Sequence, residues 1–226
     1  MGSGERFHWR ETATRLTRLL EEWDLSVDAA GRWLEARDPA GAPVLRFYPP
    51  LVQRVGEPGP DPADYLAGLR DEFGLELVLL LQAGSAALGV WRDDELVAHK
   101  VIKKYVVRGR GRAQPAYLKT RGKSRYGSRL RLRNARALLV EVNQKLGEWA
   151  RDWGPFERIF YSCPVRTWPE LLRAKPPPPF GVGDPLVKIP VDVHVPDFEE
   201  LLRVRRILTH GRVSAAEPLP TRAGGS

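Results

Sequence analysis

The sequence has little of the chemistry that many small functional sites use. Of its 226 residues one is a cysteine, Cys163, and four are scattered histidines. Neither a disulfide framework nor a zinc site with the usual ligand spacing is therefore expected. No apolar run approaches the roughly 18 residues of a membrane-spanning helix, and the start lacks the apolar region of a signal peptide. We predict a soluble, cytoplasmic protein with no metal, small-molecule cofactor or membrane partner.

Acidic residues are missing from one long stretch. None occurs between Glu95 and Glu141, whereas Lys100 to Arg136 contains fourteen lysines and arginines. The formal net charge is +8, yet the rest of the chain has twenty-two basic residues against twenty-eight acidic ones. The positive field therefore comes from one segment, which indicates a local site for a polyanion. Nucleic acid is the predicted partner, and an anionic membrane surface is the weaker alternative.

The middle of this stretch lacks any apolar period. Residues 109–127 mix Gly, Pro, Ser, Thr and Arg, a composition that cannot offset the entropy of ordering. A strand over Leu96–Val107 leads in, and a helix beginning near Ser128 leads out. We therefore predict a mobile basic loop over residues 108–127, with the uncharged amide of Gln114 near its tip.

The apolar pattern outside the loop predicts an α/β domain, a mixed β-sheet with flanking helices. A nearly continuous apolar run is typical of a central strand covered on both faces. After the loop, apolar residues spaced by three and four predict one long helix. Capping-box spacing at Thr167 and Asp197 predicts two more helices. The expected strands are Leu75–Gln82, Ala86–Trp91, Leu96–Val107, Phe156–Tyr161 and Leu186–Pro190, and the long helix carries Leu138, Val142, Leu146, Trp149 and Trp153.

We interpret the first part of the chain as a support for the main domain or as a docking surface. An amphipathic helix is expected over Arg10–Trp23 and a short strand over Val44–Tyr48. Asp61 or Asp64 is expected to cap a helix that runs to Phe73. We therefore divide the chain into an N-terminal extension of a helix and short strands (1–60), a main α/β domain (61–213) and a disordered tail (214–226).

Two segments of the sequence resemble a known protein family. These are HKVIKKYVVRGRGRAQ, which ends at Gln114, and YGSRLRLRNARALLVEVNQKLGEW, which begins at Tyr126. They are similar to the Vms-like release factors, relatives of the catalytic middle domain of eukaryotic and archaeal peptide chain release factors. The resemblance runs from about Leu75 to Arg212. It implies a ribonuclease H-like core and the release of nascent chains from peptidyl-tRNA on stalled ribosomes.

The resemblance also implies a catalytic tripeptide at the loop tip. Gln114 lies where the family has the glutamine of Gly-Ser-Gln or Thr-Ala-Gln, preceded here by Arg112 and Ala113. The family's Gly-x-x-Leu-Arg-x-x-Asn segment is matched at Gly127, Leu130, Arg131 and Asn134. The chain departs from the pattern at Arg112, where termination factors prefer glycine, at Pro115, and at Ala135, where an acid is usual.

The chemistry of these residues fits ester hydrolysis inside RNA. Glutamine does not titrate near neutral pH, so Gln114 would position water by hydrogen bonding while a backbone N–H faces the oxyanion. The surrounding cations would neutralise phosphates, and Tyr126 would stack on an unpaired base. The predicted RNA-binding residues are Arg108, Arg110, Lys119, Arg121, Lys123, Arg125, Tyr126, Arg129, Arg131 and Arg133.

Three functions follow from these features. The first is a peptidyl-tRNA hydrolase of the release-factor type, expected to be a monomer, with the large ribosomal subunit and peptidyl-tRNA as partners. The second is an endoribonuclease that cuts the tRNA acceptor end with the same loop. The third is a non-catalytic ribosome- or RNA-binding factor, motivated by the departures at Arg112 and Pro115.

Overall fold

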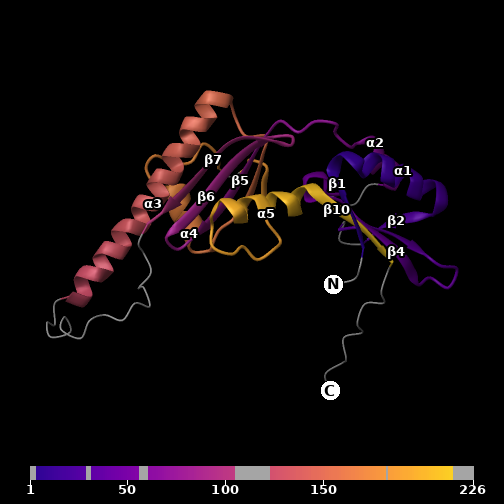
Figure 1. The fold of residues 1–226 in the computed structure, drawn as a ribbon, viewed down its shortest axis with the longest axis horizontal. Helices are drawn as coiled ribbons and strands as arrows, with labels where there is room; N and C mark the ends of the chain where they lie inside the picture. Colours follow the sequence, from indigo (N-terminus) through magenta and orange to yellow (C-terminus); the bar gives the residue numbers. More distant parts are fainter. Residues whose placement is uncertain (1–3, 29–31, 56–60, 105–122, 182, 216–226) are drawn as a thin grey trace, which may run out of the picture. The chain divides into compact units, whose positions relative to one another are not determined.

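The computed structural model describes residues 4–28, 32–55, 61–104, 123–181 and 183–215, with the backbone alone for 123–128. The chain forms two compact units. Met1–Asp71 with Val204–Ser226 is called here the N-terminal unit, and Glu72–Arg203 the central unit. Each contains a five-stranded sheet with helices, so the protein is mixed α/β as predicted (Figure 1).

The sheet of the central unit begins as an antiparallel meander. Gly84, with φ of 86°, makes the tight turn between the first two strands, and Asp93-Asp94 makes the second turn, as expected from the sequence. Two further strands then add in parallel to one side of the first strand, giving the order β7-β6-β5-β8-β9. The strands are β5 (Leu75–Gln82), β6 (Ser85–Arg92), β7 (Glu95–Lys103), β8 (Arg158–Ser162) and β9 (Leu186–Lys188).

Two helices make the crossovers that parallel strands require. Helix α3 (Lys123–Trp153) connects β7 to β8, and α4 (Thr167–Arg173) lies between β8 and β9. Helix α3 ends where Gly154 adopts φ of 94° and its N–H donates to the carbonyl of Ala150, a left-handed C-terminal cap.

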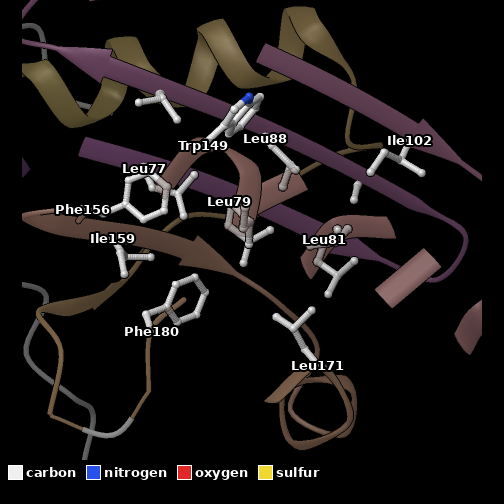
Figure 2. Close-up of a cluster of buried hydrophobic side chains, with 14 of the residues drawn as sticks. Leu77, Leu79, Leu81, Leu88, Ile102, Trp149, Phe156, Ile159, Leu171 and Phe180 are labelled. Atoms are coloured by element: carbon white, nitrogen blue, oxygen red, sulfur yellow. The ribbon is translucent and has the colours of Figure 1, made fainter. Parts of the chain in front are cut away.

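Strand β5 is the centre of the core, as its apolar run predicts. Leu75 to Leu81 are all buried. Alternate leucines of β5 share a cluster with the buried stripe of α3 and with Leu171 of α4 (Figure 2). Burying each such leucine stabilises the fold by roughly 1.5–3 kcal/mol, which makes this sheet a firm support for the segment after β7.

The sheet of the N-terminal unit joins both ends of the described chain. Its order is β1-β10-β4-β3-β2, all antiparallel. One face packs on Leu16 of α1 and Tyr65 of α2. The elements are β1 (Glu5–His8), α1 (Thr12–Glu22), β2 (Leu25–Val27), β3 (Leu34–Arg37), β4 (Pro43–Tyr48), α2 (Pro62–Ala67) and β10 (His210–Ala215), with 3-10 turns at η1 (Trp9–Glu11) and η2 (Leu51–Gln53).

Strand β10 differs from the sequence-based expectation. No strand was expected here and the tail was expected to begin at residue 214, but His210–Ala215 pair with β1 and β4. The compact N-terminal unit also takes residues 61–71 and 204–213, which were assigned to the main domain, and residues 214–215, which were assigned to the tail. The sequence of β10 is polar and contains glycine, so its composition does not favour a strand. The strand forms because its backbone pairs with β1 on one side and β4 on the other.

Helix α5 (Phe198–Thr209) contains the boundary between the two units. Its expected cap is confirmed, because the Glu200 N–H donates to Asp197 Oδ1 at 2.8 Å. The cap expected at Thr167 is wrong: Thr167 is already helical, and Arg166 precedes it without a side-chain cap. Among the described helices, none has an apolar stretch long enough to cross a bilayer.

Candidate nucleic-acid interface

Helix α3 changes character along its length. From Leu138 to Trp149 it carries a buried apolar stripe. Residues 123–137, called here the basic arm, contain six cations and no acid. Of the arm side chains described, from 129 to 137, none is buried. At 1.5 Å per residue the arm is about 22 Å long, and Figure 1 shows this pink start of α3 running beyond the strands of the central sheet.

The arm's described arginines lie on two sides of the helix. Arg129, Arg133 and Arg136 are exposed, and their spacing of four and three puts them on one side. Arg131 is half-buried and lines a cavity at the root of the arm. The exposed row can follow a sugar–phosphate backbone, while Arg131 lies where the arm meets the rest of the unit.

The root of the arm is held by four contacts, to the end of β7 and to the segment of α4 and Pro176. Lys104 Nζ, just beyond β7, lies 2.6 Å from Glu141 Oε2, and the Lys104 N–H donates to the Gly84 carbonyl at 2.8 Å. Asn143, fully buried, donates through Nδ2 to the carbonyls of Leu171 and Pro176, both at 2.9 Å. The end of β7 and the start of α3's buried half are therefore held in place; in sequence, residues 105–122 and then the basic arm lie between them.

A cavity of about 350 Å³ lies at the root of the arm. It combines apolar walls with a guanidinium and a carboxylate, those of Arg131 and Glu170. Such a lining suits a small group with both an apolar and a polar part. The lining residues are Gln82, Ala83, Gly84, Arg131, Leu132, Ala135, Leu138, Leu139, Thr167 and Glu170.

The predicted catalytic residues lie outside the described residues. These are Arg112, Ala113 and Gln114, together with the predicted RNA-binding residues Arg108, Arg110, Lys119 and Arg121. Lys123, Arg125 and Tyr126 fall in the first turn of α3, where the backbone is described. Arg129, Arg131 and Arg133 lie on the basic arm. Six of the predicted RNA-binding residues therefore lie together on α3.

The helix begins earlier than the sequence predicted. The basic loop was expected to extend to Gly127, with a helix from about Ser128, but α3 begins at Lys123. Gly127 and the two serines suggested a loop, whereas lysine, arginine and leucine around them are good helix formers. Five residues assigned to the loop are thus part of a regular helix.

The arm's charge adds to the field of the helix itself. The first turn of α3 contains no acidic residue, while the N-terminus of any long helix carries about half a positive charge. Cations near this end destabilise the helix when no partner is bound, and a bound polyanion stabilises it. The electrostatics of the arm therefore favour phosphate groups.

Among the cavity residues, sequence reasoning singled out Arg131 for binding and did not find Gln82, Thr167 or Glu170, nor the ion pair at the arm's root. Gln82 comes from β5 and Thr167 and Glu170 from α4, and Lys104 lies 37 positions before its partner Glu141. A single sequence gives no sign of such pairing. Only the cation run itself was visible beforehand.

The sequence matches the family model described as Bacteroidetes VLRF1 release factor over residues 76–216. That region runs from the second residue of β5 to one residue beyond β10, so it includes the basic arm.

Curated proteins and solved structures give further similarities. The chain is 30% identical over 150 residues to the tRNA endonuclease ANKZF1 of Bos taurus, covering 64% of this chain. The Homo sapiens protein of that name is 33% identical over 147 residues, 63% of this chain. The chain spans only about a fifth of the length of these relatives (20%). A solved structure titled "Vms1 mitochondrial localization core" aligns with a TM-score of 0.49 at 12% identity, covering 95% of this chain and 86% of that one.

Proposed function

The chain belongs to the Bacteroidetes VLRF1 release factor family, and on that premise we propose that it frees nascent chains from peptidyl-tRNA on stalled ribosomes. The partners would be RNA of the large ribosomal subunit and the tRNA, in the cytoplasm. We also propose that the central unit is ribonuclease H-like. Its antiparallel meander followed by two parallel strands, with α3 as the first crossover, supports that assignment.

The basic arm is the observation that carries the proposal. It is a helix with six cations and no acid, and it continues directly from the segment that contains Gln114. On single-stranded RNA, each neutralised phosphate contributes about 0.7 to the slope of log affinity against log salt. Six contacts would give a slope near −4, so the affinity would fall steeply as the salt concentration rises. The arm would thus hold the Gln114 segment against RNA.

Gln114 would act by positioning rather than by proton transfer. Its amide can donate and accept hydrogen bonds and has no titratable proton near neutral pH. It can therefore orient a water molecule toward the ester carbonyl, with a backbone N–H near the developing oxyanion. Ala113 would allow close approach to RNA, and Arg112 would contact a phosphate.

The test uses ribosomal complexes with labelled peptidyl-tRNA. We expect Gln114→Ala to reduce peptide release by about 100-fold or more, the usual loss when one such positioning donor is removed, while ribosome binding persists. Gln144→Ala is the matched control, because Gln144 is an exposed glutamine on α3 away from the arm. Unchanged release in Gln114→Ala would refute the catalytic role of Gln114.

A second candidate reaction is cleavage of the tRNA near its acceptor end. It is favoured by the similarity to proteins named tRNA endonuclease. Sequencing the RNA product distinguishes the two reactions. An intact CCA terminus indicates ester hydrolysis, whereas a shortened terminus indicates RNA cleavage.

A further inference from the structure

The cavity at the root of the basic arm is bounded by three elements of the central unit. One wall is the side of α3 that carries Leu132, Ala135 and Leu139, which share a side because they are spaced by three and four. A second wall is α4, and the turn Ala83-Gly84 between β5 and β6 bounds the cavity between them. A group inside the cavity therefore contacts both helices and the turn.

The α3 wall of the cavity is apolar. Leu138 and Leu139 are buried, Ala135 is half-buried, and Leu132 is exposed. A flat ring laid against Leu132 and Ala135 would remove apolar surface from water, which is favourable. This wall therefore suits the face of an aromatic ring.

The α4 wall offers hydrogen-bonding groups instead. Thr167 and Glu170 are three positions apart, so their side chains lie on the same side of α4, and both line the cavity. Within the described part of the chain, neither the Thr167 hydroxyl nor the Glu170 carboxylate has a hydrogen-bonding or ion-pair partner. Both groups are therefore available to a ligand.

Gln82 adds a third polar group, and its amide is held in one orientation. Its Nε2 donates to the carbonyl of Val193 at 2.7 Å and to that of His194 at 2.8 Å. Both amide protons are thus used, and the group left for a ligand is the carbonyl oxygen, an acceptor. With the Glu170 carboxylate, the cavity favours a ligand that donates hydrogen bonds.

The charges of the cavity favour a neutral ligand. Its lining contains one cation, Arg131, and one anion, Glu170, so neither a phosphate nor an ammonium group is favoured overall. Outside the cavity the charge is positive, because Arg136 is one turn along α3 from Leu132 and belongs to the exposed arginine row. A strand of RNA fits both conditions, since its phosphates can contact the arginines while an unpaired base enters the cavity.

We propose that this cavity binds one unpaired base of single-stranded RNA and selects a base with an exocyclic amino group. The base would stack on the α3 wall and donate from its amino group to Glu170, as carboxylates do when they read cytosine. Uracil has a carbonyl oxygen at the same position, which a carboxylate repels. The inference rests on the proposed function for its RNA partner, and all three bases of a CCA terminus carry the required amino group.

The test compares two fluorescent RNA 12-mers, one of cytidine and one of uridine. Their affinities for the full chain are measured by anisotropy at neutral pH. We expect the wild type to bind the cytidine RNA about 10-fold more tightly, the discrimination typical of one good pair. The ratio of the two affinities is the readout, because a change in overall charge affects both RNAs alike.

The first variant changes the group that reads the base. Glu170→Gln should reduce the ratio to within about twofold, because a carboxamide accepts from cytosine and also donates to uracil. Glu199→Gln is the charge-matched control, since Glu199 is exposed, belongs to the same unit and does not line the cavity. It should keep the wild-type ratio.

The second variant fills the cavity without changing any charge. Ala135→Phe places a ring where the base would lie, and it should also abolish the preference. Ala67→Phe adds the same bulk at an exposed position of α2 and should keep the wild-type ratio. Thermal melts confirm that each variant is folded.

Two results would overturn the proposal. One is equal affinity of the wild type for the two RNAs, and the other is a cytidine preference that survives both Glu170→Gln and Ala135→Phe. Neither result touches the role of Gln114, because no peptide release is measured. A chain that binds neither RNA would contradict the RNA partner itself, and with it the proposed function.

Discussion

Among single residues, Glu200 shows how one carboxylate organises a turn of chain. It is nearly buried, and it accepts from Arg203 Nε and Nη2, both at 2.7 Å, and from the His194 N–H at 2.7 Å. Arg203 also donates to the carbonyl of Asp192 at 2.8 Å. The hydrogen bonds from Arg203 hold the pKa of Glu200 down to about 2, from an ordinary value of 4.5. The segment before α5 is therefore tied to the helix through this carboxylate.

The prediction at this scale concerns acid stability. A lowered carboxyl pKa stabilises the fold fully above pH 4.5, and that stabilisation is lost as the pH falls toward 2. We expect Glu200→Gln to lower the free energy of unfolding at pH 7 by about 2–3 kcal/mol and to flatten its dependence on pH in that window. Urea unfolding at pH 7, 4.5 and 3 measures both. Glu199→Gln is the control, because Glu199 is its exposed neighbour; equal effects of the two changes would contradict the prediction.

Among the elements, the two halves of α3 are stabilised in different ways. Its second half is stabilised by burial against β5 to β7, whereas the basic arm relies on helix propensity. Arg129 and Arg133 are one turn apart, and like charges at that spacing destabilise a helix by about 0.2–0.5 kcal/mol. The arm is consequently an element whose stability depends on its partner.

Hydrogen exchange tests this difference along α3. We expect amides of residues 123–137 to exchange faster than those of 138–153, since opening the arm disrupts little buried contact. Adding single-stranded RNA should slow exchange in the arm and leave the second half unchanged. Uniform protection along the helix without RNA would show that the arm is stabilised in some other way.

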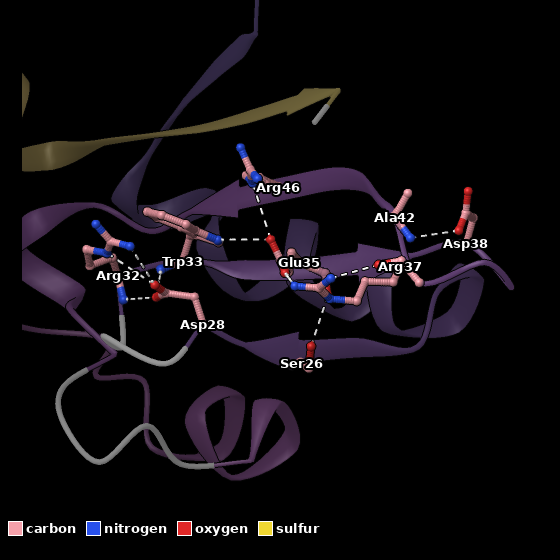
Figure 3. Close-up of polar contacts among 10 residues, drawn as sticks. Ser26, Asp28, Arg32, Trp33, Glu35, Arg37, Asp38, Ala42 and Arg46 are labelled. Atoms are coloured by element: carbon pink, nitrogen blue, oxygen red, sulfur yellow. Dashed lines mark hydrogen bonds and ion pairs between the residues drawn. The ribbon is translucent and has the colours of Figure 1, made fainter. Parts of the chain in front are cut away.

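The elements also show what the sequence made predictable. Strands β5 and β6 were found almost to the residue because they are long, apolar and bounded by turns. Strands β1, β2 and β3 were missed because three or four residues carry too short an alternation. The arm's charge was visible as a run, but the network around Glu35 was not. Trp33 and Arg37 reach this carboxylate from nearby positions, whereas Arg46 reaches it only because β4 pairs with β3 (Figure 3).

On the scale of the whole molecule, β10 decides the integrity of the N-terminal unit. It lies between β1 and β4, with Arg212 and Val213 opposite Tyr48 and Phe47. Without it, two strands lose their hydrogen-bonding partner and the buried face of the sheet opens. The central unit contains all of its own strands, so its core does not require β10.

Shortening the chain tests this dependence. We expect a chain ending at Thr209 to lose protease resistance within residues 4–71 and to keep a folded central unit. A chain ending at Ala215 should behave as the full chain does. Limited proteolysis with mass spectrometry identifies the sites of cleavage, and a protected N-terminal unit in the Thr209 chain would disprove the role of β10.

The place of β10 also has a consequence for biosynthesis. Translation produces β4 more than 160 residues before β10, and at about 5–20 residues per second that gap lasts roughly 10–30 seconds. During that time β1 and β4 are edge strands without their shared neighbour, a situation that favours pairing with other chains. A nascent copy of this protein would therefore benefit from a chaperone near the exit tunnel until Ala215 has emerged.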